Sequence, residues 1–154
     1  EQYDAAFGNL NGADPGSVAK EIARRQIESG ILGGYLAYDG DVSIGWCNAN
    51  DKVNFPVESC IGTHFHAPAE KREKAVICFE IAPEYRGKGV ATALLQRVLA
   101  DATAGGYTAV EGFPVERSER YEWDNPGPVR LYEKLGFCRV AKQDGRLVMR
   151  KLLK

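Results

Sequence analysis

The sequence predicts an α/β fold in which helices flank a mixed central sheet. An apolar strand at 75–81 leads through a glycine-rich turn into an amphipathic helix, and another strand follows at 108–113. The two strands of such a strand–helix–strand unit lie parallel, with a right-handed crossover. Two hairpins, at 34–48 and 137–152, add antiparallel strands. Because the chain has 154 residues, we expect residues 1–154 to form a single domain.

The first half of the chain predicts a helix, a hairpin and a long loop. Asp14, followed by proline, is typical of a helix start, and Gly30 is typical of a helix end. The strands at 34–38 and 42–48 enclose a tight Asp-Gly-Asp turn, which indicates a hairpin. Residues 49–73 carry charge and proline with little periodicity, so we expect a long loop there.

The second half predicts two helices and a closing hairpin. The helix after the glycine-rich turn ends at the glycines 105–106. A polar loop at 114–127 leads to a short helix closed by Gly136, and strands at 137–141 and 146–152 end the chain. Apolar residues at helical spacing give the first of these helices a buried stripe, namely Ala91, Leu94, Leu95, Val98 and Ala102.

Composition excludes several classes of partner. The chain has 20 basic and 21 acidic residues, so its net charge is −1, and we expect no nucleic-acid partner because that would need a basic excess. No apolar run approaches the roughly 18 residues that cross a membrane, so we expect no membrane partner. Four widely spaced cysteines, without a Cys-x-x-Cys pair, favour free thiols in a reducing cytoplasm.

The segment 77–91, ICFEIAPEYRGKGVA, carries the clearest functional signal. Its strand breaks at a proline and passes through a basic, glycine-rich turn directly into a helix. Unpaired backbone amides gather at the positive end of a helix dipole, which suits a phosphate or pyrophosphate group. Arg86 and Lys88 add positive charge, and Gly89 lets an anion approach the backbone closely. Neither a G-x-G-x-x-G fingerprint nor a Walker loop is present.

This turn, with its R-x-x-G-x-A spacing, resembles the acyl-CoA signature of the GNAT superfamily of N-acetyltransferases. The segment 125–137, NPGPVRLYEKLGF, looks like the second signature of the same superfamily. The resemblance covers the chain from about residue 75 to its end. It implies a sheet with a splayed parallel strand pair, acetyl-CoA as cosubstrate and an amine as acetyl acceptor. The superfamily normally opens with a strand, so that strand either precedes Glu1 or is degenerate in residues 1–13.

The resemblance also assigns roles to individual residues. The turn amides would hold the pyrophosphate, and the backbone of Phe79 and Ile81 would pair with the pantetheine arm, with one amide facing the thioester oxygen. Tyr132 would lie near the sulfur and protonate the departing thiolate. The residues assigned to acetyl-CoA in this way are Phe79, Ile81, Arg86, Gly87, Lys88, Gly89, Val90, Ala91, Asn125 and Tyr132.

A general base must take a proton from the attacking amine. Glu80 and Glu111 are carboxylates within otherwise apolar strands that should border the splayed cleft, which makes both candidates. For either one, a salt bridge at a strand edge is the alternative, and a base acting through water also satisfies the geometry. Cys78 would be the nucleophile of a two-step route, but it lacks the electropositive setting that activates a thiol, so we expect direct transfer in a ternary complex.

The acceptor is expected to be a primary amine of a small molecule or a peptide. The side chains expected to line its pocket are those of Trp46, Asn48, Phe55, His64, His66, Tyr121 and Trp123. His64 and His66 form a His-x-His pair, but no further ligand stands at a convincing spacing, so no metal site is expected.

Two other functions stay open at this point. The first is a catalytically inactive acyl-CoA-binding sensor or interaction domain, and the second is a protein that holds a nucleotide at the turn 86–91. The closing hairpin leaves a strand edge through which a homodimer could pair.

Overall fold

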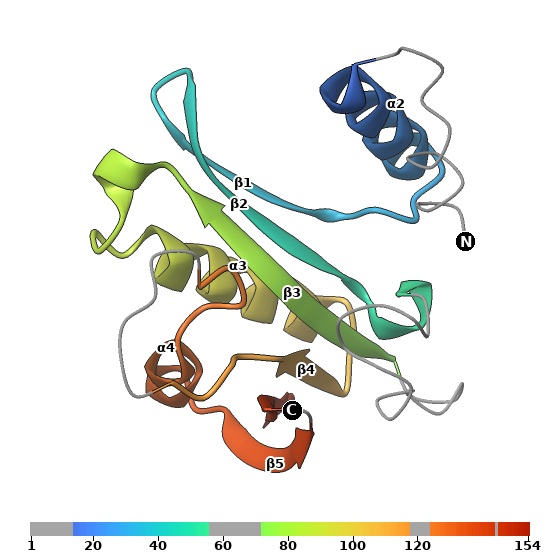
Figure 1. Ribbon diagram of the computed structural model, residues 1–154. Coiled ribbons are helices and arrows are strands. Elements are labelled where there is room, and N and C mark those ends of the chain that lie inside the picture. Colours follow the sequence, from blue (N-terminus) through green and yellow to red (C-terminus); the bar gives the residue numbers. More distant parts are fainter. Residues whose placement is uncertain (1–13, 56–71, 118–123, 144) are drawn as a thin grey trace. The chain divides into compact units, whose positions relative to one another are not determined.

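The computed structural model describes residues 14–55, 72–117, 124–143 and 145–154 (Figure 1). The chain divides into two compact units, Glu1–Gly33 and Gly34–Lys154. In the first unit the described part is the helix α2, Pro15–Glu28. Asp14 caps it, because its carboxylate accepts a hydrogen bond of 2.8 Å from the Ser17 amide. The predicted start of this helix is therefore confirmed. No described helix is long and apolar enough to cross a membrane.

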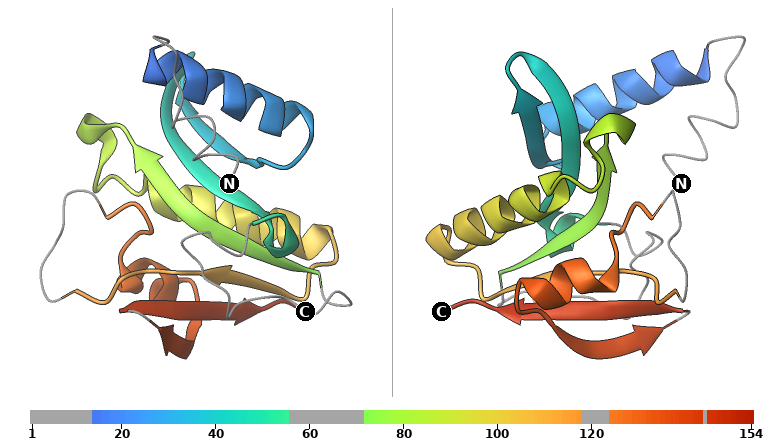
Figure 2. Two further views of the ribbon diagram at one scale, coloured as in Figure 1. Left: turned by 45° about the vertical axis from the view of Figure 1, so that its right-hand side comes forward. Right: turned by 90° about the vertical axis from the view of Figure 1, so that its left-hand side faces the viewer.

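The second unit contains a six-stranded mixed sheet of order β1-β2-β3-β4-β6-β5, in which only β3 and β4 run parallel (Figures 1 and 2). The predicted mixed sheet is confirmed. The strands are β1 Gly34–Asp39, β2 Val42–Asp51, β3 Glu73–Ile81, β4 Ala109–Gly112, β5 Cys138–Gln143 and β6 Arg146–Leu152.

Helix α3, Val90–Ala104, connects β3 to β4 and packs across one face of the sheet (Figure 2). Its predicted stripe is confirmed for Leu94, Leu95, Val98 and Ala102, which are all buried, whereas Ala91 is partly buried. Short helices complete the unit: η1 Lys52–Asn54, η3 Pro83–Tyr85 and α4 Val129–Lys134.

The predicted loop at 49–73 is wrong at both ends. β2 continues to Asp51, where Ala49 is buried, and β3 already begins at Glu73. Pairing with the neighbouring strand decides the conformation of these polar ends, since Asn50 lies opposite Ala75 and Asp51 lies opposite Lys74.

A bulge in β3 reverses which side chains face the helices. The register with β2 shifts between Asn48, which lies opposite Cys78, and Ala49, which lies opposite Val76, so Ile77 is the extra residue. Before the bulge, Val76 points into the main core. After it, Phe79 points into that same core, three residues later. A strand without a bulge would have placed these two side chains on opposite faces.

The parallel pair β3–β4 diverges directly after this point. The pairing runs from Glu73 opposite Ala109 to Val76 opposite Gly112 and then stops, while β3 continues to Ile81. The splayed strand pair that the superfamily resemblance implied is therefore present.

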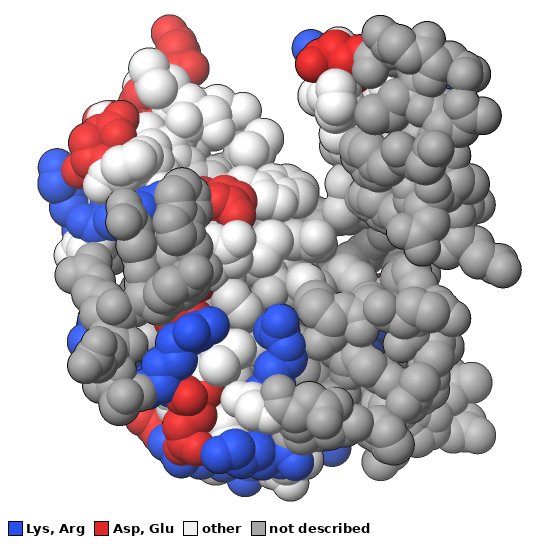
Figure 3. All heavy atoms as spheres, in the orientation of Figure 1, with Lys and Arg blue, Asp and Glu red and all other residues white. Residues whose placement is uncertain are grey.

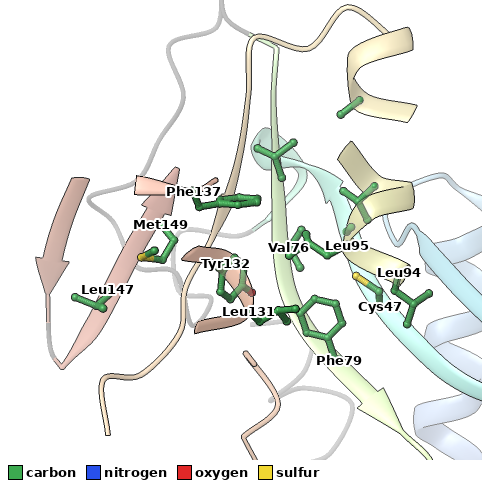
Figure 4. Packing of buried hydrophobic residues seen from close by; sticks show 14 residues of the cluster. Cys47, Val76, Phe79, Leu94, Leu95, Leu131, Tyr132, Phe137, Leu147 and Met149 are labelled. Atoms are coloured by element: carbon green, nitrogen blue, oxygen red, sulfur yellow. The ribbon is translucent and has the colours of Figure 1, made fainter. Parts of the chain in front are cut away.

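The main hydrophobic core lies beside the point where β3 and β4 diverge. Tyr132 of α4 is fully buried there, between residues of β3 and β6 that include Val76 and Met149 (Figure 4). Its ring packs edge-on against Phe137 with the centroids 5.3 Å apart. A Cβ added at Gly112 would overlap this ring and lie 2.7 Å from the tyrosine hydroxyl oxygen. Glycine at the end of β4 is thus what lets the Tyr132 ring sit against the strand.

We predict that Gly112→Ala lowers the free energy of unfolding by about 1–3 kcal/mol, because the new methyl group overpacks the core against Tyr132. Chemical denaturation measures this. Tyr132→Leu removes the ring atoms that the methyl group meets, so the cost of Gly112→Ala should shrink when both changes are combined. Strictly additive costs in the double variant would contradict the contact as its cause.

Candidate active site

A cavity of about 1200 Å³ opens where β3 leaves β4. This volume is above the roughly 300–1,000 Å³ of pockets for drug-sized ligands, so a larger ligand fits. Its walls are the end of β3, the turn into α3, the chain after β4, and the segment 124–134. The sequence-predicted residues that line it are Phe79, Glu80, Ile81, Arg86, Gly87, Gly89, Val90, Ala91 and Asn125.

The turn before α3 presents bare backbone to this cavity. Gly89 is the N-cap of α3, no side chain caps the helix, and its first turn contains no acidic residue. The first four amides of a helix have no acceptor within the helix. Gly87 and Gly89 have positive φ angles of 75° and 91°, and a Cβ at either would meet nothing within 4 Å. These features fit the pyrophosphate of a coenzyme A ester.

Arg86 and Lys88 act differently in this turn. The Arg86 side chain lines the cavity and donates a hydrogen bond of 3.0 Å from Nε to the Ile81 carbonyl, which ties the turn to the end of β3. Lys88 does not line the cavity. Its ammonium lies 5.4 Å from the ring centroid of Tyr85, whose hydroxyl donates to Asp39 at 2.8 Å.

The backbone of β3 offers one open donor to the cavity rather than two. The Ala82 amide donates to Ile44 of β2, so by alternation the amides of Phe79 and Ile81 point away from β2, into the divergence. The Phe79 amide already donates to the Asn125 carbonyl at 2.6 Å, contrary to the expectation that it would be free for the cosubstrate. Among the described residues none accepts from the Ile81 amide.

Tyr132 does not reach the cavity, although the resemblance placed it at the sulfur. Its side chain is fully buried and its hydroxyl donates to the Pro126 carbonyl at 2.7 Å. Burial raises the pKa of this hydroxyl well above its usual value. In this structure Tyr132 holds the segment 124–127 in place.

Glu80 is exposed on the cavity wall and lies opposite Trp46 in the β2–β3 register, which puts both side chains on one face of the sheet. Over the middle of β1–β3 this side of the molecule is largely uncharged, as Figure 3 shows for the described residues. Asn48 lies opposite Cys78 on the same two strands. Phe55 instead packs on the small core of Ala75, Phe113 and Val148, so it does not line the cavity. His64, His66, Tyr121 and Trp123 lie outside the described residues.

Glu111 lies in a buried ionic cluster and not on the cavity. Its carboxylate accepts a hydrogen bond of 2.5 Å from Arg150 of β6 and lies 2.6 Å from the ammonium of Lys52. Glu73 contacts the same two cations, at 3.3 Å and 3.6 Å. The side chains of Lys52, Glu73 and Glu111 are nearly inaccessible to solvent. Of the two alternatives that the sequence left open for Glu111, the ion pair is the one observed.

Two carboxylates on the cavity were missed at the sequence level, namely Glu133, which pairs with Arg139 at 3.1 Å, and Asp124. Asp124 lines the cavity, and its Oδ1 is buried with no hydrogen-bond partner among the described residues. Burial raises the pKa of this carboxyl, and Arg117 acts on it in the opposite direction. Its place directly before the second signature was the available signal, but a polar loop residue gave no reason to expect burial.

The described cysteines Cys47, Cys78 and Cys138 are free thiols. Burial raises the pKa of the Cys47 thiol, so this side chain behaves as an inert core residue. Within the described ranges, no group of three His, Cys, Asp or Glu side chains is placed to hold a metal ion.

Comparison with known proteins identifies the family. The family model "Acetyltransferase (GNAT) family" matches residues 7–137, which is most of the chain. A search of curated proteins finds no match. Many solved structures share the fold. Those named below all have low sequence identity to this chain.

Three of these similar structures illustrate the family. A protein described as a GNAT acetyltransferase from Desulfovibrio desulfuricans has a TM-score of 0.64 at 17% identity, over 97% of this chain and 89% of that one. NAA60 from Arabidopsis thaliana, in complex with a bisubstrate analogue, has a TM-score of 0.59 at 18% identity, over 87% and 82%. The ribosomal-protein-S18-alanine N-acetyltransferase from Escherichia coli has a TM-score of 0.55 at 13% identity, over 86% and 77%.

We predict that Glu111→Ala lowers the free energy of unfolding by about 3–5 kcal/mol, because it leaves the buried Lys52 ammonium with too little negative charge around it. Arg97→Ala is the matched control, since it breaks an exposed ion pair with Asp101 whose Arg97 side chain is 70% accessible, and it should cost about 0–1 kcal/mol. Denaturant unfolding of both variants checks this. Equal costs would show that the buried cluster contributes no more than a surface pair.

Proposed function

Because the chain belongs to the GNAT acetyltransferase family, we propose that it transfers the acetyl group of acetyl-CoA to a primary amine by direct attack in a ternary complex. The observation that carries this proposal is the open N-terminus of α3, which faces a large cavity beside the unpaired end of β3. One cavity thus offers both the N-terminus of α3 for an anion and the free backbone of β3 for pairing with an extended ligand.

The chain's own residues supply the binding. The amides of Gly87, Gly89, Val90 and Ala91 hold the pyrophosphate, whereas the Lys88 amide already donates to the Tyr85 carbonyl at 3.3 Å. Arg86 contributes charge while it fixes the turn. The pantetheine arm lies along β3 beyond Phe79, and the Ile81 amide is the donor for the thioester oxygen. Bound acetyl-CoA supplies the activated acetyl group.

Glu80 is the base that we propose for the attacking amine. It lines the cavity from the side of the sheet that carries Trp46, while Phe79 and Ile81 face the helices. An amine that enters from this side meets the carboxylate before it meets the thioester. Glu111 has no such part, because its charge is already neutralised by Lys52 and Arg150.

The acceptor class that we propose is a primary amine of a small molecule or a peptide. The similar structures from Escherichia coli and Arabidopsis thaliana are, by their names, a protein-alanine acetyltransferase and an enzyme bound to a bisubstrate analogue. The free thiols support a reducing, cytoplasmic setting. A homodimer would use an outer strand, β1 or β5, each of which has one unpaired edge within the described sheet.

An acyl-CoA-binding domain without catalysis is the second candidate. It is favoured by one observation, namely that the Tyr132 hydroxyl is bonded to Pro126 inside the core instead of facing the cavity. Such a protein would bind acetyl-CoA and release no free thiol with any amine.

We predict that acetyl-CoA and CoA raise the midpoint of thermal unfolding, whereas ATP and NAD at the same concentration do not. At about 100 times the dissociation constant, a ligand adds roughly 2.7 kcal/mol, which for a chain of this size is about 5–10 °C. Absence of a shift with acetyl-CoA and CoA would contradict both candidate functions. A shift with ATP alone would support a nucleotide at the turn.

We predict that Glu80→Gln lowers kcat for acetyl transfer by about 10²-fold or more, because the amide cannot accept the amine proton. The dissociation constant for acetyl-CoA, measured by calorimetry, should stay within about threefold. Glu84→Gln is the matched control, since Glu84 is a neighbouring exposed carboxylate that does not line the cavity. An unchanged kcat in Glu80→Gln would remove Glu80 as the base.

A further inference from the structure

The transfer needs an acid that protonates the departing thiolate. In this structure Tyr132 is not placed to be that acid. Its hydroxyl proton is donated to the Pro126 carbonyl, and burial makes the hydroxyl a weaker acid than a free phenol. A phenol already has a pKa of about 10, above the roughly 8.5 of a thiol, so a further rise works against proton donation.

Asp124, unlike Tyr132, lines the cavity. The carbonyl of the next residue, Asn125, reaches the Phe79 amide at 2.6 Å, at the point where β3 leaves β4. The turn that carries Asp124 therefore lies at the start of the open stretch of β3 on which the thioester is proposed to lie, and Asp124 lines the same cavity.

The segment that carries Asp124 is held from several sides. The Gly127 amide donates to the Asp124 carbonyl at 2.8 Å, which closes a tight turn, and the Tyr132 hydroxyl holds Pro126 at 2.7 Å. A carboxylate on a fixed turn keeps its geometry through a reaction. Its Oδ1 nevertheless has no hydrogen-bond partner among the described residues, which is costly for a buried polar atom unless a ligand supplies the partner.

Titratable groups near Asp124 or on the same cavity come from several elements. The charged residues that share the cavity, besides those discussed next, are Arg86, Arg130, Glu133, Lys134 and Arg139. Arg117, in the chain after β4, lowers its pKa, and burial acts more strongly in the opposite direction. Tyr132 of α4 lies close enough for Asp124 to raise the pKa of the tyrosine hydroxyl. Glu80 of β3 lines the same cavity. Of the carboxylates in this cleft, Glu80 is exposed and Asp124 is partly buried, so these two have the separate environments that acid–base pairs use.

We propose that Asp124 is a catalytic proton carrier that takes a proton from the attacking nitrogen and gives it to the departing sulfur. This inference rests on the proposed function. The nitrogen forms a bond to the thioester carbon, the carbon–sulfur bond breaks, and its electron pair leaves with sulfur. Asp124 accepts the proton that the nitrogen loses and returns it to the thiolate, so the carboxylate is regenerated. Glu80 prepares the neutral amine beforehand by passing the proton of the ammonium to solvent.

The test compares Asp124→Asn and Asp124→Glu with Glu116→Gln, a control whose carboxylate pairs with Arg139 and Lys142 and does not line the cavity. In Asp124→Asn we expect kcat to fall about 10²–10⁴-fold, with KM for acetyl-CoA within about threefold. The part of the acidic limb of the pH profile of kcat/KM that comes from Asp124 should disappear, while the part that comes from Glu80 and the amine remains. Asp124→Glu should recover part of kcat. A retained kcat and pH profile, or a loss explained by lost stability or CoA affinity, would overturn the proposal.

A second measurement does not depend on turnover. The ¹³C titration of the Asp124 carboxyl is recorded with CoA and with desulfo-CoA, and we expect the two titrations to differ because only CoA places a sulfur beside the carboxylate. Identical titrations would overturn the proposal while acetyl transfer by the wild type still stood. Failure of the wild type to bind CoA would instead refute the proposed function, and the role of Asp124 with it.

Discussion

The divergence of β3 from β4 is the constraint on which the remaining features of the structure depend. Two local causes act at one level of the sheet. The bulge at Ile77 turns the following part of β3, and the Tyr132 ring lies against Gly112, the last residue of β4. Neither strand can continue the ladder beyond Val76 opposite Gly112. The free backbone of β3, the cavity and the placement of Asp124 all follow from this interruption.

A buried ionic cluster stabilises the paired stretch of the same two strands. Glu73 lies at the start of the paired stretch and Glu111 lies one residue before its end, and Lys52 and Arg150 bridge the two carboxylates. A buried cluster of this kind gains little net stability over apolar packing, but removal of one member is expensive. Its position therefore favours one register of β3 against β4, and with it one position for the divergence. Glu73 and Glu111 do not line the cavity, and of the carboxylates that do, Glu133 is paired with Arg139. We therefore assign proton transfer in the cavity to Glu80 and Asp124.

Local patterns predicted much of this architecture. Helical spacing and capping residues identified α2 and α3, and the Asp-Gly turns identified both hairpins. The glycine-rich turn was also predictable, because a positive φ at Gly87 and Gly89 and an uncapped helix are properties of a short contiguous segment. The ends of β2 and β3 were not predictable from local patterns. Their residues are polar and look like a loop, but pairing with the neighbouring strand keeps them extended.

Side-chain roles in the site depended on contacts that sequence does not show. Glu80 and Glu111 look alike as carboxylates within strands, yet one is exposed on the cavity and the other is paired with Lys52, a residue far away in the chain. Tyr132 stands in the expected motif, but the direction of its ring follows from the space beside Gly112. Asp124 became notable only once its burial and its unpartnered oxygen were visible.

The contact between Asn125 and Phe79 ties these elements into one mechanism. Because the Asn125 carbonyl occupies the Phe79 amide, an extended ligand along β3 finds its first free donor at Ile81. The inner limit of that ligand is thus set by the turn that carries Asp124, while its outer limit is set by the amides at the start of α3. In our proposal, a thioester stopped at this limit accepts a hydrogen bond from the Ile81 amide and lies in the cavity that Asp124 also lines. In this proposal, the hydrogen bond from the Phe79 amide to the Asn125 carbonyl limits how far the ligand extends along β3. The same hydrogen bond fixes the turn that carries Asp124.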